Sequence, residues 1–175
     1  DDTFEKVRPV LATLSSVVIR CGQRLGDAQA MKLVNNTINA GCRLATLEAT
    51  ATGRKLGLSL AAITERLNST TSCNRTSMDM LPALLEGRKA TNFSLALMLK
   101  DLVQAIQLGQ EFGAPMPLGN TVRALLQIGV NTLGEDARLE DVIQLTENLA
   151  AVTIGGASTD TAAPDADALR LVDAT

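Results

Sequence analysis

Apolar residues recur every three or four positions along most of the chain, which is the spacing of one face of an α-helix. The pattern is longest over residues 22–48 and 93–112, which predicts two long helices. Shorter stretches with the same spacing predict helices over residues 1–14, 59–67, 78–87, 121–132 and 139–152. We therefore expect an all-α domain in which short helices pack around two long ones.

One short stretch departs from this helical pattern. Residues 17–21, Val-Val-Ile-Arg-Cys, are rich in β-branched side chains and end at Gly22, which predicts a buried strand. Because a single strand cannot satisfy its own backbone groups, we expect the first helix and this strand to be the remnant of a sheet-containing domain.

The composition changes after the last predicted helix. From Gly155 onward the chain is dominated by small and polar residues, too poor in large apolar side chains to pack, although residues 166–172 could form one short helix. We expect this segment to be a flexible extension or a linker. The predicted division is a remnant at residues 1–21, a helical domain at 22–154 and a tail at 155–175.

Composition and charge exclude several function classes. The net charge is −3 and the only aromatic residues are three Phe, so neither a basic footprint nor a stacking platform for nucleic acid is present. The chain has no His, which excludes His-based metal sites and Ser/His or Cys/His nucleophiles, and we predict no metal.

The remaining bulk features favour a cytoplasmic protein. No apolar run approaches the roughly 20 residues of a membrane span, and nothing near residue 1 resembles a signal peptide, so we expect no membrane partner. Cys21, Cys42 and Cys73 are odd in number and widely spaced, which fits reduced thiols better than a disulfide framework.

A candidate catalytic pair lies in the first long helix. Lys32 and Asn36 are four residues apart, so their side chains share one face of a helix that we expect to be largely buried. A partly buried lysine can exchange protons in acid/base catalysis. The alternative is that Lys32 extends to solvent and Asn36 bonds a neighbouring carbonyl.

The surrounding stretch resembles a family motif. It resembles the linker-helix signature of the β-hydroxyacid dehydrogenases, the family of 3-hydroxyisobutyrate dehydrogenase and tartronate semialdehyde reductase, through Gly22-x3-Gly26-x-Ala28-Gln29-x2-Lys32-x2-Asn35-Asn36. The resemblance implies that Lys32 is the catalytic acid/base and that Asn36 holds the substrate. Ala28 stands where many members carry a third glycine.

Two further segments resemble the same family. Thr71, Ser72 and Asn74 align with a Ser-Gly segment that meets the substrate carboxylate, although Ser72 replaces its glycine. The alternative is that this segment is an ordinary connection between helices, capped by a hydroxyl side chain. Phe93-x6-Lys100-Asp101-Leu102 resembles a Phe, Lys-Asp-Leu signature, which implies that Lys100 reaches the cofactor and substrate cleft.

Asp101 has a different expected role from Lys100. We expect it to hold the helices or a lysine in place rather than to react. Neighbouring residues on a helix do not face each other, so Lys100 and Asp101 are predicted to find separate partners. We also expect the amines of Lys32 and Lys100 to point into one open groove.

The resemblance implies a fold and an activity for the chain. The implied fold is the multi-helical C-terminal domain of the 6-phosphogluconate-dehydrogenase type, and the implied reaction is oxidation of a small 3-hydroxy acid with NAD or NADP. No Gly-x-Gly-x-x-Gly fingerprint occurs, so a missing domain would bind most of the cofactor and this chain alone would be inactive. A homo-oligomer is also implied. The alternative is a helical oligomerisation or ligand-binding module without dehydrogenase activity.

Overall fold

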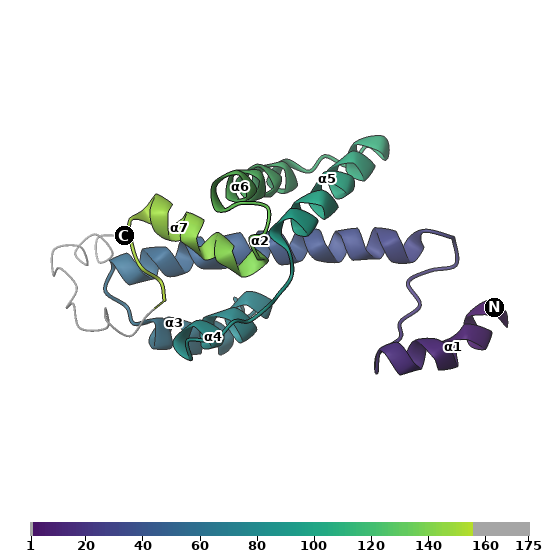
Figure 1. The fold of residues 1–175 in the computed structure, drawn as a ribbon, viewed down its shortest axis with the longest axis horizontal. Coiled ribbons are helices and arrows are strands. Elements are labelled where there is room, and N and C mark those ends of the chain that lie inside the picture. Colours follow the sequence, from purple (N-terminus) through teal and green to yellow (C-terminus); the bar gives the residue numbers. More distant parts are fainter. Residues whose placement is uncertain (1, 156–175) are drawn as a thin grey trace.

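The computed structural model describes residues 2–155, and regular structure in this range is helical throughout. The longest helix, α2, runs through the middle of the molecule and the other helices pack around much of its length (Figure 1). The helices are α1 (Asp2–Leu14), α2 (Asp27–Lys55), α3 (Leu60–Asn68), η1 (Thr76–Met80), α4 (Leu81–Leu85), α5 (Leu95–Glu111), α6 (Pro117–Leu133), η2 (Leu139–Asp141) and α7 (Val142–Ala150).

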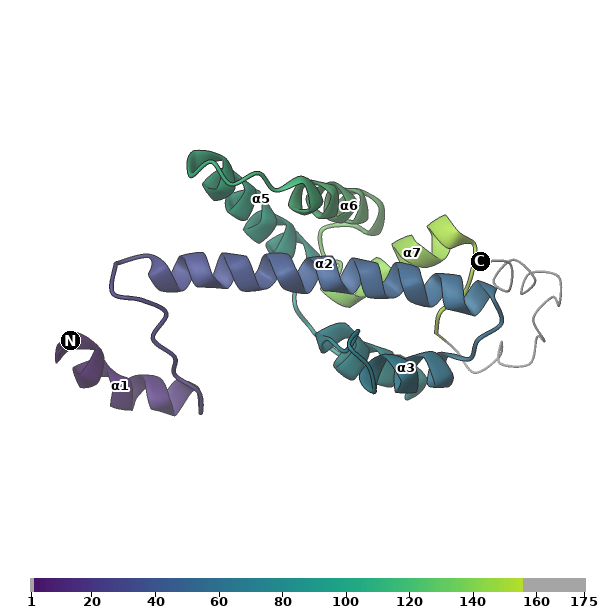
Figure 2. The same ribbon diagram turned by 180° about the vertical axis from the view of Figure 1, so that it is seen from behind.

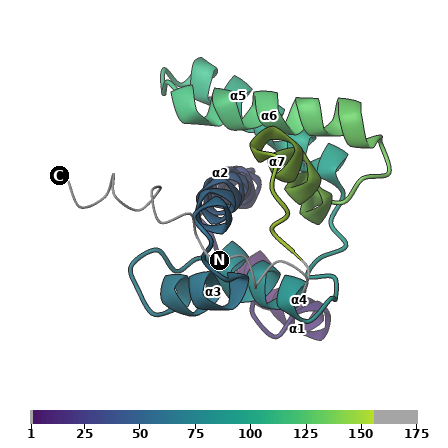
Figure 3. The same ribbon diagram turned by 90° about the vertical axis from the view of Figure 1, so that its left-hand side faces the viewer.

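The helices form layers on two sides of α2. Seen end-on, α5 and α6 lie on one side of α2 and α3 and α4 on the other, with α7 beside α6 (Figure 3). The core between them is filled mainly by leucine, as a chain with three aromatic residues requires. Its most buried members include Leu47, Leu81, Leu102, Leu126 and Val142. The prediction of an all-α domain built on two long helices is confirmed.

Several helices begin at other residues than predicted, because capping side chains and proline set where a helix starts. Ser59 and Ser94 cap α3 and α5, each accepting a hydrogen bond from a backbone N–H three residues on. α6 begins four residues before the predicted start because Pro117 suits the first helical turn. The helix predicted over 78–87 is divided between a π-helical turn, η1, and α4.

The predicted strand at residues 17–21 is wrong. This segment is irregular, and the side chains of Val17 and Ile19 are exposed. A β-branched run becomes a strand only beside another strand, and within residues 2–155 no strand is present to pair with it. α1 likewise lies apart from the helices around α2 in both views (Figures 1 and 2). The predictions for the tail after Gly155 fall outside the described residues.

A tight turn sets the direction in which α2 begins. Gly26 precedes the helix with φ of 95°, a conformation that favours glycine. Asp27 is the first helical residue, and its carboxylate accepts a hydrogen bond from the backbone N–H of Arg24 at 2.9 Å. A Cβ on Gly22 would lie 2.1 Å from Asp27 Oδ2, so this turn also requires glycine at position 22.

Gly22→Ala is expected to lower the free energy of unfolding by about 1 kcal/mol, since the added methyl group displaces the Asp27 carboxylate from the turn. Amide hydrogen exchange in the first turn of α2 should become faster. Gly41→Ala is the control, because a Cβ there meets only Val122 at 3.9 Å and should stabilise the helix by about 0.5–1 kcal/mol. A loss of stability in both variants would contradict this account of the turn.

Candidate active site

Three of the predicted site residues meet at one buried carboxylate, that of Asp101 on α5. Lys32 Nζ lies 3.0 Å from Asp101 Oδ1 and 2.8 Å from Oδ2. Asn36 Nδ2 donates to Oδ2 at 2.7 Å, and Lys100 Nζ lies 3.2 Å from Oδ1. The fold therefore brings Lys32 and Asn36 of α2 to Asp101 of α5, which lies 69 and 65 positions away in the sequence.

Two expectations about these side chains are corrected. The alternative for Asn36, a neighbouring carbonyl, is wrong, because its amide binds the Asp101 carboxylate. Lys32 is partly exposed, as its alternative had it, but its amine also pairs with Asp101. Lys100 and Asp101 also do not find separate partners, since the long lysine stem lets the amine reach the neighbouring carboxylate. The expectation that Asp101 holds a lysine is confirmed.

The first half of α2 is less buried than expected. Leu33, on the side toward α5, is buried, whereas Met31, Val34 and Ile38 are exposed. This half of α2 extends beyond the short helices α3 and α4, so only part of its surface is covered (Figure 2). Lys32 and Asn36 therefore lie at the edge of the core.

The electrostatics of the site keep Asp101 ionised. Burial raises the pKa of Asp101, but hydrogen bonds from Lys32, Asn36 and Lys100 together outweigh it and leave the pKa below its ordinary value. Two ammonium groups against one carboxylate leave the cluster with one surplus positive charge. The side chains of Lys32 and Lys100 are 44% and 51% exposed, so a dissolved anion can approach both amines.

Hydrogen-bonding capacity remains after Asp101 is satisfied. An ammonium group has three N–H donors, and Lys32 directs them toward two carboxylate oxygens, which leaves one donor for another acceptor. Asn36 Oδ1 accepts from Asn35 Nδ2 at 3.3 Å, which fixes the amide with its nitrogen toward Asp101. The arrangement can bind an oxyanion or a hydroxyl and move a proton at Lys32 Nζ.

Asn74 lies just before η1 and contacts α2 far from Lys32. Its Nδ2 donates to Thr46 Oγ1 at 3.0 Å, and its Oδ1 accepts from the backbone N–H groups of Thr76 and Ser77 at the start of η1. Thr46 follows Lys32 by fourteen positions in one continuous helix, a separation of about 21 Å along the axis. Asn74 therefore contacts α2 about four helical turns away from Lys32.

Thr71 and Ser72 precede Asn74 in an exposed loop. The structure therefore does not bring these three residues together with Lys32 and Asn36. Their role in binding the substrate carboxylate stays a prediction. The geometry of Asn74 also fits the alternative, a connection held by its own polar side chains.

Asn74→Ala is expected to lower the free energy of unfolding by about 1–3 kcal/mol, because it leaves backbone N–H groups at the start of η1 without an acceptor. Thr71→Ala, in the same exposed loop, should change it by less than about 0.5 kcal/mol. Thermal unfolding of both variants measures the difference. Equal stability of Asn74→Ala and the wild type would contradict the structural role.

The polar face of α2 continues beyond the residues that the sequence analysis selected. Asn39 and Arg43 continue the face of Lys32 and Asn36 at intervals of three and four residues, which was the available signal. Arg43 is buried, and its Nε has no hydrogen-bond partner within the described part of the chain. Burial lowers the pKa of Arg43, while the charges of Glu140 and Asp79 oppose that shift.

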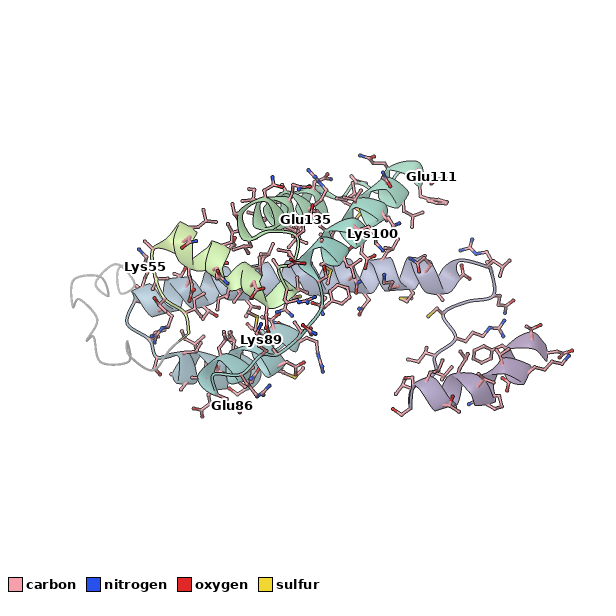
Figure 4. The ribbon with its side chains drawn as sticks, viewed as in Figure 1. Lys55, Glu86, Lys89, Lys100, Glu111 and Glu135 are labelled. Carbon is pink, nitrogen blue, oxygen red and sulfur yellow. The ribbon has the colours of Figure 1, made fainter. Side chains whose placement is uncertain are left out.

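Lys100, the residue expected to reach the cofactor, has an accessible amine. Lys100 stands on the part of α5 that lies over α2, where its half-exposed amine can bind a phosphate or ribose oxygen (Figure 4). No Gly-rich phosphate-binding turn exists in the sequence.

No three metal-binding side chains come together in residues 2–155, and no helix there has the length and apolarity to span a membrane.

Comparison with known proteins gives a consistent set of relatives. Residues 26–146 match the family described as the NAD-binding domain of NADP-dependent 3-hydroxyisobutyrate dehydrogenase. The chain is 29% identical over 156 residues to 2-(hydroxymethyl)glutarate dehydrogenase of Eubacterium barkeri, covering 87% of this chain and 51% of that protein. It is 32% identical over 125 residues to a probable mitochondrial 3-hydroxyisobutyrate dehydrogenase of Arabidopsis thaliana, covering 67% and 36%.

Solved structures give the same result. A 3-hydroxyisobutyrate dehydrogenase of Mycobacterium tuberculosis with L-serine superimposes with a TM-score of 0.73 at 28% identity, covering 83% of this chain and 52% of that one. The enzyme of Salmonella typhimurium, at 18% identity and a TM-score of 0.72, shares the fold. The chain thus spans between about a third and a half of the length of these relatives.

Proposed function

Because the chain belongs to the 3-hydroxyisobutyrate dehydrogenase family, we propose that it supplies the proton-transfer half of an NAD(P)-dependent dehydrogenase for a small 3-hydroxy acid. The observation that carries this proposal is the meeting of Lys32, Asn36 and Lys100 at the Asp101 carboxylate. A structural ion pair would need one lysine, whereas this cluster presents two amines at the surface.

Lys32 is the proposed acid/base. In oxidation Lys32 first releases one ammonium proton to solvent, and the resulting amine takes the proton of the substrate hydroxyl while the carbon gives up a hydride. In reduction the ammonium gives a proton to the carbonyl oxygen. NAD or NADP, when bound, accepts or supplies that hydride. Asp101 keeps the Lys32 amine in one position, which lowers the cost of reaching a reactive geometry.

Asn36 and Lys100 would bind and orient the substrate and the cofactor. The Asn36 amide keeps its orientation through Asn35 and Asp101, and its second N–H can donate to the substrate oxygen. Lys100 would hold the cofactor or the substrate carboxylate. The surplus positive charge favours an anionic substrate, which agrees with a hydroxy acid and excludes a neutral alcohol as the best ligand.

The experiment is a hydride-transfer assay that follows reduced nicotinamide absorbance, with NAD and NADP. The chain should be tested alone and fused to the nucleotide-binding half of the Mycobacterium tuberculosis relative. The panel should include 3-hydroxyisobutyrate, 2-(hydroxymethyl)glutarate and L-serine, which the names of the relatives suggest. We expect turnover of at least one compound by the fusion and none by the chain alone. A folded fusion without turnover on the whole panel would refute the proposal.

The second candidate function is a helical assembly module without activity of its own. The observation that favours it is the exposure of large apolar side chains on the first half of α2. Such a surface suits self-association. Assembly and catalysis are compatible, and we expect the protein to form a homo-oligomer.

A further inference from the structure

A cavity lies between the second half of α2 and the helices α6 and α7, which are on the same side of α2 (Figure 3). Its volume is about 410 Å³. Its floor is apolar and is formed by Leu44 and Ala51 of α2, Leu125 of α6 and Leu145 of α7. Leu149 also lines it and is 72% exposed, so the cavity is open to solvent. Its size is that of a small-molecule site.

Two opposite charges line this cavity without partners. Glu48 and Lys55 are both exposed, and neither side chain makes an ion pair or a hydrogen bond within residues 2–155. Lys55 lies at the end of α2, beside α7 (Figure 4). The two residues are seven positions apart, which places them on one face of α2 and about 10 Å apart along its axis. Each is therefore free to bind an opposite charge on a ligand.

A buried hydroxyl lines the same cavity without a partner. Thr146 of α7 is only 6% exposed, and its hydroxyl makes no hydrogen bond within the described part of the chain. Other buried helical threonines differ, since Thr50 and Thr64 each donate to the carbonyl four residues earlier. A buried polar group without a hydrogen bond is costly, so a bound molecule that supplies one is favoured.

We propose that this cavity binds a small zwitterion, an α-amino acid with an apolar side chain. Its ammonium group pairs with Glu48, its carboxylate pairs with Lys55 and accepts a hydrogen bond from Thr146, and its side chain lies on the apolar floor. An ammonium and a carboxylate on one carbon span about 9 Å when a hydrogen-bonded partner is added at each end. The spacing of Glu48 and Lys55 matches this span because both side chains are flexible.

The charges favour a zwitterion over other occupants. Glu48 would repel an anion bound at Lys55, and Lys55 would repel a cation bound at Glu48. A helix of another protein would need an apolar groove several turns long. Here Glu48, Thr52 and Lys55 interrupt the apolar surface on the α2 side.

The cavity is separate from the candidate active site. Glu48 follows Lys32 by sixteen positions in α2, about 24 Å along the axis. An α-amino acid in the cavity therefore does not contact Lys32 or Asn36. Its binding requires neither the cofactor nor the proposed dehydrogenase activity, so the two proposals can fail separately.

The test is isothermal titration calorimetry of the 175-residue chain with L-leucine, whose side chain is apolar and uncharged. We expect one saturable site per chain. N-acetyl-L-leucine lacks the ammonium group and L-leucinamide lacks the carboxylate, so each should bind about tenfold more weakly or worse. Glycine has no side chain to cover the apolar floor and should also bind more weakly.

Variants of the chain locate the site. Glu48→Gln should raise the dissociation constant for L-leucine by about tenfold or more, because a carboxamide carries no charge. Thr146→Val removes the hydroxyl but keeps the shape of the side chain, and should raise the constant by about three- to tenfold. Glu65→Gln is the matched control, an exposed glutamate on α3 outside the cavity, and should bind like wild type. Lys32→Ala should also bind L-leucine normally.

Circular dichroism checks that the variants are folded. Absence of L-leucine binding up to about 10 mM would overturn the proposal. So would equal binding of L-leucinamide, or an unchanged dissociation constant in Glu48→Gln. Loss of binding in Lys32→Ala would assign the amino acid to the candidate active site instead. If L-leucine did not bind and Leu149→Glu lowered the mass of an oligomer, a protein partner would cover the cavity and the proposal would fail.

Discussion

Lys32→Ala is expected to lower kcat for hydride transfer by about 10²–10⁴-fold in the chain joined to a nucleotide-binding half. The variant has no group at this position that can take or return the hydroxyl proton. Asp101 keeps its bonds to Asn36 and Lys100, so the fold around the carboxylate should persist. Steady-state kinetics measures the loss, and circular dichroism checks the folding.

Two other lysine variants separate proton transfer from charge. Lys32→Arg keeps a cation beside Asp101 but does not release a proton near neutral pH, so kcat should stay low while KM changes little. Lys55→Ala removes an exposed lysine at the far end of the same helix and should leave both constants unchanged (Figure 4). Full activity of Lys32→Arg would show that Lys32 supplies only charge.

The sequence predicted the helices of this site better than their contacts. Apolar spacing identified α2 and α5, and the four-residue interval placed Lys32 and Asn36 on one face. That both amines would meet at Asp101 could not be derived, because spacing does not say which face of α5 meets α2. The same limit applies to Asn74, because the spacing of residues does not say that it contacts α2 at Thr46, about 21 Å along the helix axis from Lys32.

The prediction of a strand at residues 17–21 was wrong for a related reason. A β-branched run has the local preference of a strand, but a strand also needs the backbone groups of a neighbour. The described chain offers none, and the segment is irregular. Local sequence preference was therefore enough to predict the helices, because a helix satisfies its own backbone hydrogen bonds. It was not enough to predict a strand, which needs a neighbour.

Asp101→Asn should lower the free energy of unfolding at pH 7 by about 1–3 kcal/mol, because three charged or polar donors lose their ionised acceptor. The pKa of Asp101 lies below its ordinary value, so the folded state favours the ionised form. Its contribution to stability is therefore complete above about pH 4, the ordinary value, and is lost as the pH falls through the lower pKa of the folded state.

The difference in stability between wild type and Asp101→Asn should thus be constant at neutral pH and shrink in acid. Denaturant unfolding at a series of pH values measures it. Asp79→Asn is the control, since Asp79 pairs with Arg75 on the surface at 2.6 Å and should contribute less than about 1 kcal/mol. If Asp101→Asn differed from wild type equally at all pH values, the ionised carboxylate would not be what holds Lys32, Asn36 and Lys100 together.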